Sequence, residues 1–206
     1  MELVTHKTGA VLTTRRIESL SDAIFAFAMT LLVLNLVIPD SSAGLSTAGL
    51  NDLLLSQLHK FFNYALSFVL LAIFWIAHHQ QFNYIQRSDS RLTWINIIIL
   101  MFVALMPFTN DLAGDFSGKT TAEILFVGNI LVLGLLFLVN WVYATRGSRL
   151  VDHDLDRALV SRGIRRNLVL PTVSIVALAL SVFIPPWSLW VYLLVPVILW
   201  LKPFRR

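Results

Sequence analysis

Six apolar stretches divide the chain, and they constrain its fold more than any other feature. They lie at about 20–38, 58–85, 92–112, 123–145, 167–185 and 187–201. Each can cross a hydrocarbon core of roughly 30 Å as a helix, although the last is short. Backbone groups in lipid must satisfy their own hydrogen bonds, so helices are the expected spanning form. The sequence therefore predicts an all-α integral membrane protein with six transmembrane helices.

The composition is that of a membrane protein and not of a soluble domain. Hydrophobic residues make up 57% of the 206 residues and charged residues only 14%, and the mean hydropathy is +0.74. A soluble domain of this length needs more polar residues to cover its core. The chain has no cysteine, which excludes disulfides, thiolate metal sites and cysteine nucleophiles. We expect one membrane domain over residues 1–206. The first three stretches do not resemble the last three, which weighs mildly against an inverted-repeat transporter.

The basic residues sort to one side of the predicted membrane. All of the 16 except Lys60 and Lys119 flank the same ends of the stretches: Lys7, Arg15, Arg16, Arg87, Arg91, Arg146, Arg149, Arg157, Arg162, Arg165, Arg166, Lys202, Arg205 and Arg206. Cytoplasmic segments carry such an excess, so both termini are predicted to be cytoplasmic in a multi-pass protein of the cell (inner) membrane. The same rule explains the net charge of +4, so we expect a lipid bilayer and no nucleic acid as partner.

The segments between the stretches carry no catalytic motif. HExxH, GxSxG, a glycine-rich phosphate loop and a TVGYG filter are all absent, so we predict neither an enzyme nor a resident cofactor. Residues 146–166 form a predicted cytoplasmic loop, and its DHDLD run at 152–156 fits a solvated, partly helical loop better than a metal site. Pro185 and Pro186 predict a tight turn between the last two stretches.

The first apolar stretch begins with polar residues, in RIESLSDAIFAFAMTLLVLNL at 16–36. The run SLSD at 19–22 fits a capping box at a helix start; alternatively the helix begins earlier and Asp22 lies inside it. At about 100° per residue, one stripe holds Arg16, Leu20, Phe27, Leu31 and Leu34, with Thr30 at its edge. Ser21 and Asp22 lie on roughly the opposite side. We predict that this side faces protein, because a carboxylate without a partner is costly in lipid.

The second stretch offers partners for Asp22 in FWIAHHQQF at 74–82. Trp75 is three or four residues from His78 and His79, so it shares a helix face with them. Their depth from the arginine-bearing end is similar to that of Asp22. We predict a buried cluster of Asp22, Ser21, Trp75 and either His78 or His79 that holds the first two helices together. Alternatively, the paired histidines are anchors at the membrane interface.

Three motifs in this order resemble the transmembrane protein 175 family, which comprises the lysosomal potassium channel and shorter bacterial relatives. Arg16, followed after three residues by Leu20-Ser21-Asp22, is similar to the family's RxxxFSD signature, with leucine in place of phenylalanine. FWIAHH at 74–79 is similar to its FW-x-x-HH stretch, and LMPFTNDLAG at 105–114 to its PF-x-T/N-x-L-x-G run.

The resemblance implies a potassium channel, selective for potassium over sodium, that has no reentrant filter loop. It also implies six spans per subunit, a homotetramer and a central pore lined by the first helix. Carried over to this chain, the main hydrophobic constriction falls at Phe27, the next apolar rings at Leu31 and Leu34, and the family's threonine at Thr30. Phe27 stands where we expect isoleucine in relatives. Potassium is then the permeant ion, and the implied partners are other copies of the chain and monovalent cations.

Other readings of the same residues stay open at this point. From periodicity alone, the stripe that contains Phe27 also fits a helix–helix interface. Asp22 with His78 or His79 can form a proton relay, which makes a proton-coupled carrier or proton pathway the alternative function. A nonconducting membrane scaffold is a third reading.

Overall fold

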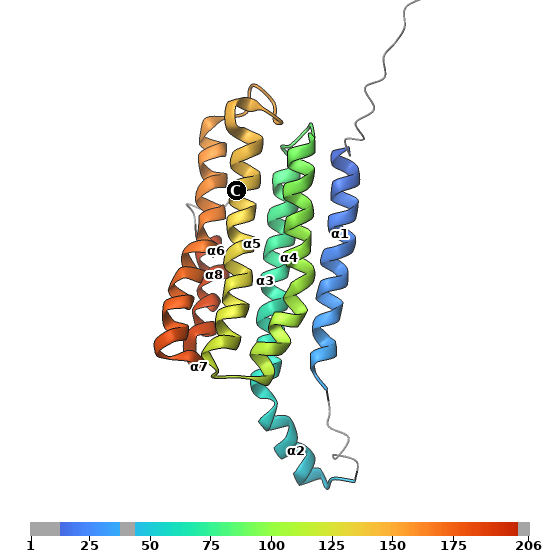
Figure 1. Ribbon diagram of the computed structural model, residues 1–206, viewed down its shortest axis with the longest axis vertical. Helices are drawn as coiled ribbons and strands as arrows, with labels where there is room; N and C mark the ends of the chain where they lie inside the picture. The colour runs from blue at the N-terminus through green and yellow to red at the C-terminus, as the bar shows by residue number, and fades with distance from the viewer. Residues whose placement is uncertain (1–12, 38–43, 202–206) are drawn as a thin grey trace, which may run out of the picture.

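The computed structural model describes residues 13–37 and 44–201 of the chain. These residues form a bundle of long helices that run roughly along one axis (Figure 1). Several sequence predictions concern residues outside this range, namely the terminal basic residues Lys7, Lys202, Arg205 and Arg206 and the last residue of the first predicted span, Ile38.

The described residues are almost entirely helical and include no strand. In chain order the elements are α1 (Thr14–Leu31), η1 (Leu32–Asn35), α2 (Thr47–Ser56), α3 (Leu58–Phe82), α4 (Ser90–Asp115), α5 (Thr120–Thr145), η3 (Arg146–Ser148), α6 (Arg157–Phe183), α7 (Pro185–Ser188), η4 (Leu189–Leu193) and α8 (Leu194–Trp200). Within the described ranges, five helices are long and apolar enough to cross a membrane: α1 continued by η1, then α3, α4, α5 and α6. The prediction of an all-α, multi-pass membrane protein is therefore confirmed.

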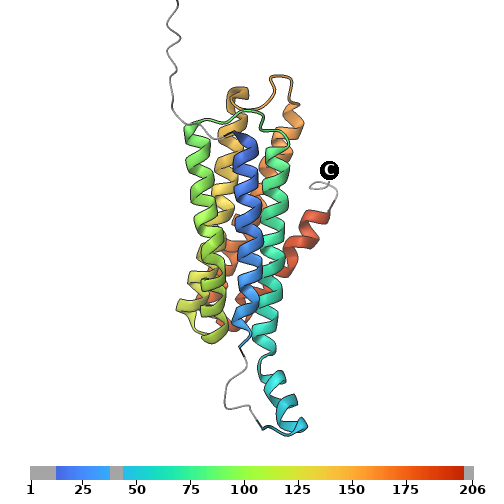
Figure 2. The same ribbon diagram turned by 90° about the vertical axis from the view of Figure 1, so that its right-hand side faces the viewer.

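The sixth predicted span, 187–201, is less regular than the others. Pro185 occupies the first position of α7 just after α6 ends at Phe183, which fits the turn expected from the two prolines. The chain then passes through the 3₁₀ segment η4 into α8, and the apolar helix Leu189–Trp200 is short. In Figure 2, α8 ends part of the way along the bundle. A sixth complete crossing is thus not apparent from helix length.

Two helical segments lie outside the predicted spans. The predicted loop 146–166 shortens because α6 begins at Arg157, where Asp156 caps the helix by accepting a hydrogen bond from the Ala158 N–H at 2.8 Å. Helix α2, which no apolar pattern signalled, begins after Ser46, whose side chain accepts from the Gly49 N–H at 3.2 Å. It lies beyond one end of the bundle (Figure 1).

All basic residues of the described ranges except Lys60 and Lys119 gather at the other end of the bundle, which we call the arginine-rich end. The starts of α1, α4 and α6 and the ends of α3 and α5 meet there (Figure 1, top). Asp89 caps α4 at this end, accepting from the Leu92 N–H at 2.8 Å and from the Tyr143 hydroxyl at 2.5 Å. Desolvation opposes ionisation of this carboxyl, but these hydrogen bonds and two nearby arginines outweigh it and hold the pKa of Asp89 below its usual value. At the opposite end, Lys60 pairs with Asp115.

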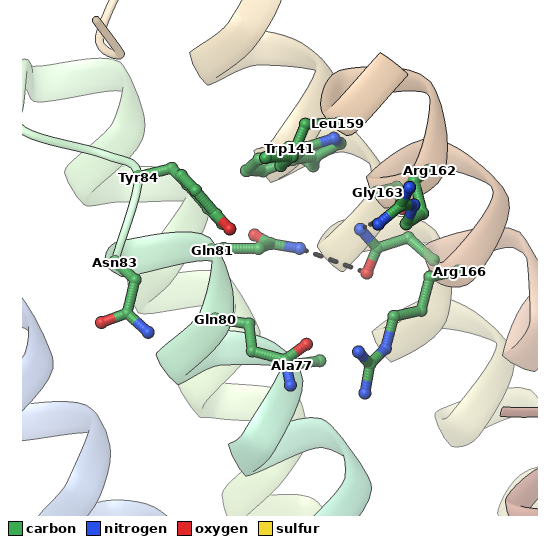
Figure 3. A pocket seen from close by; sticks show the side chains of 11 residues that line it. Ala77, Gln80, Gln81, Asn83, Tyr84, Trp141, Leu159, Arg162, Gly163 and Arg166 are labelled. Atoms are coloured by element: carbon green, nitrogen blue, oxygen red, sulfur yellow. Dashed lines mark hydrogen bonds between the residues drawn. The ribbon is translucent and has the colours of Figure 1, made fainter. Parts of the chain in front are cut away.

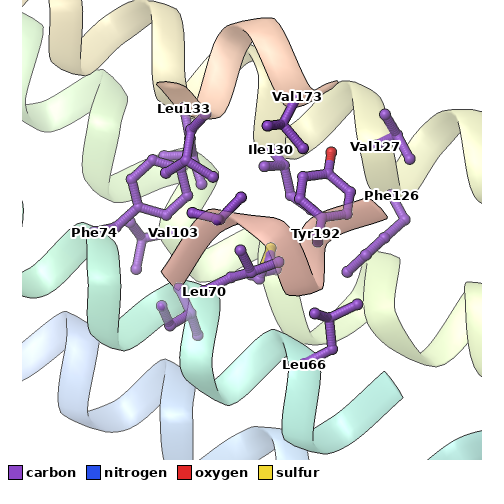
Figure 4. Close-up of a cluster of buried hydrophobic side chains, with 14 of the residues drawn as sticks. Leu66, Leu70, Phe74, Val103, Phe126, Val127, Ile130, Leu133, Val173 and Tyr192 are labelled. Atoms are coloured by element: carbon purple, nitrogen blue, oxygen red, sulfur yellow. The ribbon is translucent and has the colours of Figure 1, made fainter. Parts of the chain in front are cut away.

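The core is built mainly from α3, α4, α5 and α6, with η4 against them (Figure 4). Phe74 and Phe137 meet with ring centroids 5.1 Å apart, and Tyr192 of η4 is fully buried, its hydroxyl donating to Ser174 at 2.9 Å. Helices α5 and α6 pack closely where Gly134 faces the ring of Pro171. Helix α1 packs against α3 and α4 at one side of this core.

Candidate functional site

Helix α1 has one buried face and one exposed face. It lies beside α3 and α4 at one edge of the bundle (Figures 1 and 2). The residues that face the bundle repeat every three or four positions: Ile17, Ser21, Phe25, Ala28 and Leu32. The helix begins at Thr14, so Asp22 lies inside it and does not cap it. Of the two positions expected for Asp22, the structure shows the one inside the helix.

The opposite face of α1 carries the stripe picked out from the sequence. Phe27 and Leu34 are each 65% exposed, and Arg16, Leu20 and Thr30 are also exposed. Leu31, nearer the bundle, is half-buried. So much exposed apolar surface on one helix is expected only if lipid or another subunit covers it, or if it lines a gate.

Two polar groups on the exposed face have distinct surroundings. The Thr30 hydroxyl donates to the Phe27 carbonyl at 2.8 Å, which leaves its lone pairs available to other groups. Arg16 has no carboxylate within ion-pair distance in the described residues of this subunit. A carboxylate partner for Arg16 is therefore not supplied by the described part of the same chain.

The cluster expected around Asp22 is divided between the two sides of α1. Asp22 is exposed, and the Trp75 indole N–H donates to its Oδ1 at 2.8 Å. The ring of His79 stacks on Trp75, with centroids 6.2 Å apart and planes 25° apart. Consecutive helical residues point about 100° apart, so a helix that buries Ser21 turns Asp22 outward. The structure thus differs from a single buried cluster.

The buried half of the cluster joins Ser21 to His78. The Ser21 hydroxyl donates to the Ile17 carbonyl at 2.8 Å and lies 3.2 Å from His78 Nε2, which is 3.0 Å from Asn96 Oδ1. The serine proton is already used and an amide oxygen only accepts, so Nε2 must carry the proton in this arrangement. His78 rather than His79 therefore contacts Ser21.

The hydrogen bonds continue from His78 across the whole bundle. Asn96 donates to Asn140 Oδ1 at 3.1 Å, Asn140 donates to Gln81 Oε1 at 2.7 Å, and Gln81 donates to Asn167 Oδ1 at 3.2 Å. We call this connected set the polar belt, and its members are Ser21, His78, Asn96, Asn140, Gln81 and Asn167. The belt links α1, α3, α4, α5 and α6 through side chains buried or half-buried in the bundle.

Sequence reasoning missed most of the polar belt. The sequence analysis did not predict a role for the three asparagines Asn96, Asn140 and Asn167, because a single amide scarcely lowers the average hydropathy of a span. Gln81, near the end of the second predicted span, is buried and also donates to the Phe137 carbonyl of α5 at 3.0 Å. Isolated amides inside apolar helices were the available signal, since such groups are costly in lipid unless paired.

The third motif fixes the other end of α1. The Asn35 side chain, at the end of η1, donates to the Pro107 carbonyl at 3.0 Å; this carbonyl belongs to the LMPFTNDLAG run in α4. In the same run, Asn110 Oδ1 accepts from the Ser67 hydroxyl at 2.7 Å and so joins α4 to α3. Helix α1 is therefore held near both ends, while the face with Phe27 and Leu34 remains uncovered within the subunit.

Replacing His78 by leucine is expected to destabilise the protein, whereas the same change at His79 is not. His78→Leu leaves the buried oxygen of Asn96 without its donor, which costs about 1–3 kcal/mol. His79 is exposed and loses only a ring contact. Thermal unfolding of the two variants in the same detergent measures the difference, and an equal loss for both would contradict the assigned roles of the two histidines.

Comparison with known proteins shows which family this chain resembles. The family model described as the endosomal/lysosomal potassium channel TMEM175 matches residues 16–107, a range that includes the first two motifs. A protein of Chamaesiphon minutus named as a potassium channel is 32% identical over 177 residues, which are 84% of this chain and 86% of that protein. A Gallus gallus protein named as the endosomal/lysosomal proton channel TMEM175 is 26% identical over 185 residues, 85% of this chain but 36% of that protein.

A solved structure agrees with the sequence matches. It is the crystal structure of a lysosomal potassium-selective channel TMEM175 homolog from Chamaesiphon minutus. The two chains superpose with a TM-score of 0.80 and 27% sequence identity, and the match covers 93% of this chain and 98% of that chain. The resemblance drawn from the three motifs is confirmed, and the chain belongs to the TMEM175 family.

Proposed function

We propose that this protein is a potassium-permeable cation channel, selective for potassium over sodium, in which α1 lines the pore of a homotetramer. The observation that carries the proposal is the asymmetry of α1. One face is hydrogen-bonded into the bundle near both ends, and the other presents Phe27 and Leu34 outside the subunit. Channel relatives support a transport function over an enzymatic one.

The proposed topology has six spans with both termini in the cytoplasm of a cell (inner) membrane. The chain is then one channel domain over residues 1–206, and the irregular segment α7–η4–α8 serves as the sixth span. The arginine-rich end of the bundle faces the cytoplasm, as the positive-inside rule requires. The partners are the bilayer, other copies of the chain and monovalent cations; potassium is the permeant ion, and no cofactor is needed.

The proposed gate is hydrophobic. Rings of Phe27, Leu31 and Leu34 from the four subunits exclude water when the helices approach and admit ions when they move apart. Thr30, on the same face, offers hydroxyl oxygens to a partly dehydrated ion. Arg16, at the mouth, needs a carboxylate from a neighbouring subunit to avoid repelling cations. Ser21, Asp22, Trp75, His78 and His79 position α1, Leu20 completes the signature motif, and none of them contacts permeating ions.

Proton conduction is the second candidate, favoured by the vertebrate relatives that are named as proton channels. In this case Asp22 and His78 or His79 relay protons along α1 and α3. The exposed position of Asp22 beside Trp75 and His79 gives such a relay access to the outside of the subunit.

Flux from liposomes separates the candidates. Vesicles are loaded with potassium chloride and a pH-sensitive dye and diluted into sodium chloride. If the protein is a potassium channel, potassium leaves the vesicles and, with a protonophore present, protons enter in exchange and change the dye signal. Vesicles loaded with sodium instead of potassium should give a smaller dye signal. The signal persists in Asp22→Asn, since the amide oxygen still accepts from Trp75. When valinomycin replaces the protonophore, potassium leaves through valinomycin and protons can enter only through the protein. A dye signal under these conditions that Asp22→Asn abolishes indicates a proton pathway. Absence of both signals supports a nonconducting scaffold and contradicts the proposal.

A further inference from the structure

The arginine-rich end of the bundle contains two hollows that differ in their lining. A cavity of about 310 Å³ lies between α3, α5 and α6, and Figure 3 shows that polar groups of its wall bind one another, since Gln81 donates to Asn167. A wider hollow of about 690 Å³ lies beside α4 and α5, with Arg91, Arg146 and Arg149 in its lining. All three arginines are exposed. The wider hollow therefore combines positive charge with access from outside the subunit.

Positive charge exceeds negative charge in this wider hollow. Its described lining holds three arginines and no aspartate or glutamate. The carboxylate of Asp89 interacts with Arg91 and Arg149, and it already accepts from the Tyr143 hydroxyl at 2.5 Å. Arg149 also lies over the Tyr143 ring, 5.0 Å from its centroid. No carboxylate of the described residues is within ion-pair distance of Arg146. Three guanidiniums against this one carboxylate leave an excess of two positive charges.

The turn that carries Arg146 and Arg149 is held against the bundle. Gly147, which follows Arg146, has a φ of +64°, in the left-handed region that favours glycine. The Leu150 N–H donates to the Ala144 carbonyl at 3.0 Å, which closes the turn onto the end of α5, and the Leu150 side chain is buried. The structure thus presents both arginines to the hollow from an anchored backbone.

Exposed apolar side chains continue from the arginines along both helices. On α5, Val142 and Val139 lie four and seven residues before Arg146, so they share its helix face, and both also line the hollow. On α4, the exposed Trp94 lies three residues after Arg91 and on the same face. Tryptophan is typical of the headgroup level of a membrane. A basic hollow that borders exposed apolar side chains fits an amphiphile better than a free ion.

We propose that the hollow beside α4 and α5 binds the phosphate headgroup of an anionic phospholipid from the leaflet at the arginine-rich end. Arg91, Arg146 and Arg149 surround the phosphate oxygens, and an acyl chain lies on Val142 and Val139. Guanidiniums recognise phosphate through paired N–H groups, and basic pockets between transmembrane helices bind anionic headgroups. The binding site goes beyond the proposed channel function and does not depend on ion conduction.

Native mass spectrometry of the purified protein tests the site, with phosphatidylglycerol as the probe and phosphatidylcholine as the zwitterionic comparison. Arg146→Gln is expected to weaken phosphatidylglycerol binding about tenfold, since it removes a charge-assisted contact with the phosphate. Arg157→Gln is the matched control, because this arginine is exposed at the same end of the bundle but lies outside the lining of the hollow. It should leave binding unchanged. Since both arginines are exposed, both variants should unfold at the temperature of the unmodified protein in the same detergent.

Four results would overturn the proposal. Equal binding by the Arg146→Gln and Arg157→Gln proteins places the lipid elsewhere. Equal affinity for phosphatidylcholine removes the need for net negative charge. Inorganic phosphate that displaces phosphatidylglycerol at equal concentration assigns the hollow to a free anion. If Arg146→Gln separates oligomers in the same spectra while each subunit still binds phosphatidylglycerol as before, the hollow receives a carboxylate from another copy of the chain. Absence of ion flux affects none of these readouts, so a failure of the channel proposal is distinguishable from a failure of this one.

Discussion

Truncating Phe27 to alanine is expected to raise resting potassium flux about tenfold in liposomes. Phe27 is 65% exposed on the face of α1 assigned to the pore, and four such rings form the largest apolar obstruction in the proposed gate. Removing them widens the constriction and lowers the cost of wetting it. A barrier lower by about 1.4 kcal/mol accelerates passage about tenfold. The assay is potassium efflux with a protonophore present, at equal protein per vesicle.

The matched control is the same substitution at Phe183. This phenylalanine is 81% exposed at the end of α6, and α6 lies on the opposite side of the bundle from α1 (Figure 1). Phe183→Ala should leave the flux at the level of the unmodified protein. Phe25 is unsuitable as a control because it is buried in the core, so its truncation would test stability. Equal leak from both variants would remove Phe27 from the pore, and an unchanged leak in Phe27→Ala would move the gate to Leu31 or Leu34.

Replacing Gly134 by alanine is expected to cause the largest loss of stability among single methyl additions to α5. A Cβ atom at this position would lie 2.8 Å from Pro171 Cδ, 2.9 Å from its Cγ and 3.2 Å from its backbone nitrogen. The proline ring is rigid and its nitrogen is part of the α6 backbone, so the two helices must separate. Overpacking of this kind costs about 1–3 kcal/mol. Small residues are what allow membrane helices to approach so closely.

Gly128 provides the control within the same helix. A Cβ atom there would meet no other atom within 4 Å, so alanine adds helix propensity without a clash. Gly128→Ala should therefore unfold at the same temperature as the unmodified protein or slightly above it, while Gly134→Ala unfolds several degrees lower. Circular dichroism during heating in one detergent compares them. If Gly134→Ala proves as stable as Gly128→Ala, the close packing of α5 on α6 is not as described.

The sequence predicted the helices well because membrane spans depend on long apolar runs, and five of the six runs correspond to helices of spanning length. The ends of the helices were predicted less accurately. Nothing in hydropathy distinguishes the first turns of α6, which carry Arg157 and Arg162, from a loop, because a helix can leave the apolar layer and continue. The final run contains enough apolar residues to be noticed, but prolines and 3₁₀ geometry make it short.

The division of α1 into a buried and an exposed face was also predictable, since helical periodicity alone separates Phe27 and Leu34 from Ser21. The choice between His78 and His79 was not. They are neighbours in sequence, and their different surroundings depend on where α1 and α4 pack against α3. For the same reason, a single sequence could not connect Asn96, Asn140 and Asn167. Their pairing is a property of the assembled bundle, and each amide alone resembles a minor interruption of an apolar helix.

The polar belt has a consequence for biosynthesis. Helices enter the bilayer in the order in which the ribosome makes them, so Ser21 arrives before His78, and Asn96 before Asn140. Ser21 and Asn96 each donate to a carbonyl of their own helix, but their hydrogen bonds to other helices form only when the partner helix follows. The set becomes complete when α6 delivers Asn167, the last member to be translated. A nascent chain that stalls before this point therefore lacks the last hydrogen bond of the belt, so the complete polar network is a property of the finished subunit.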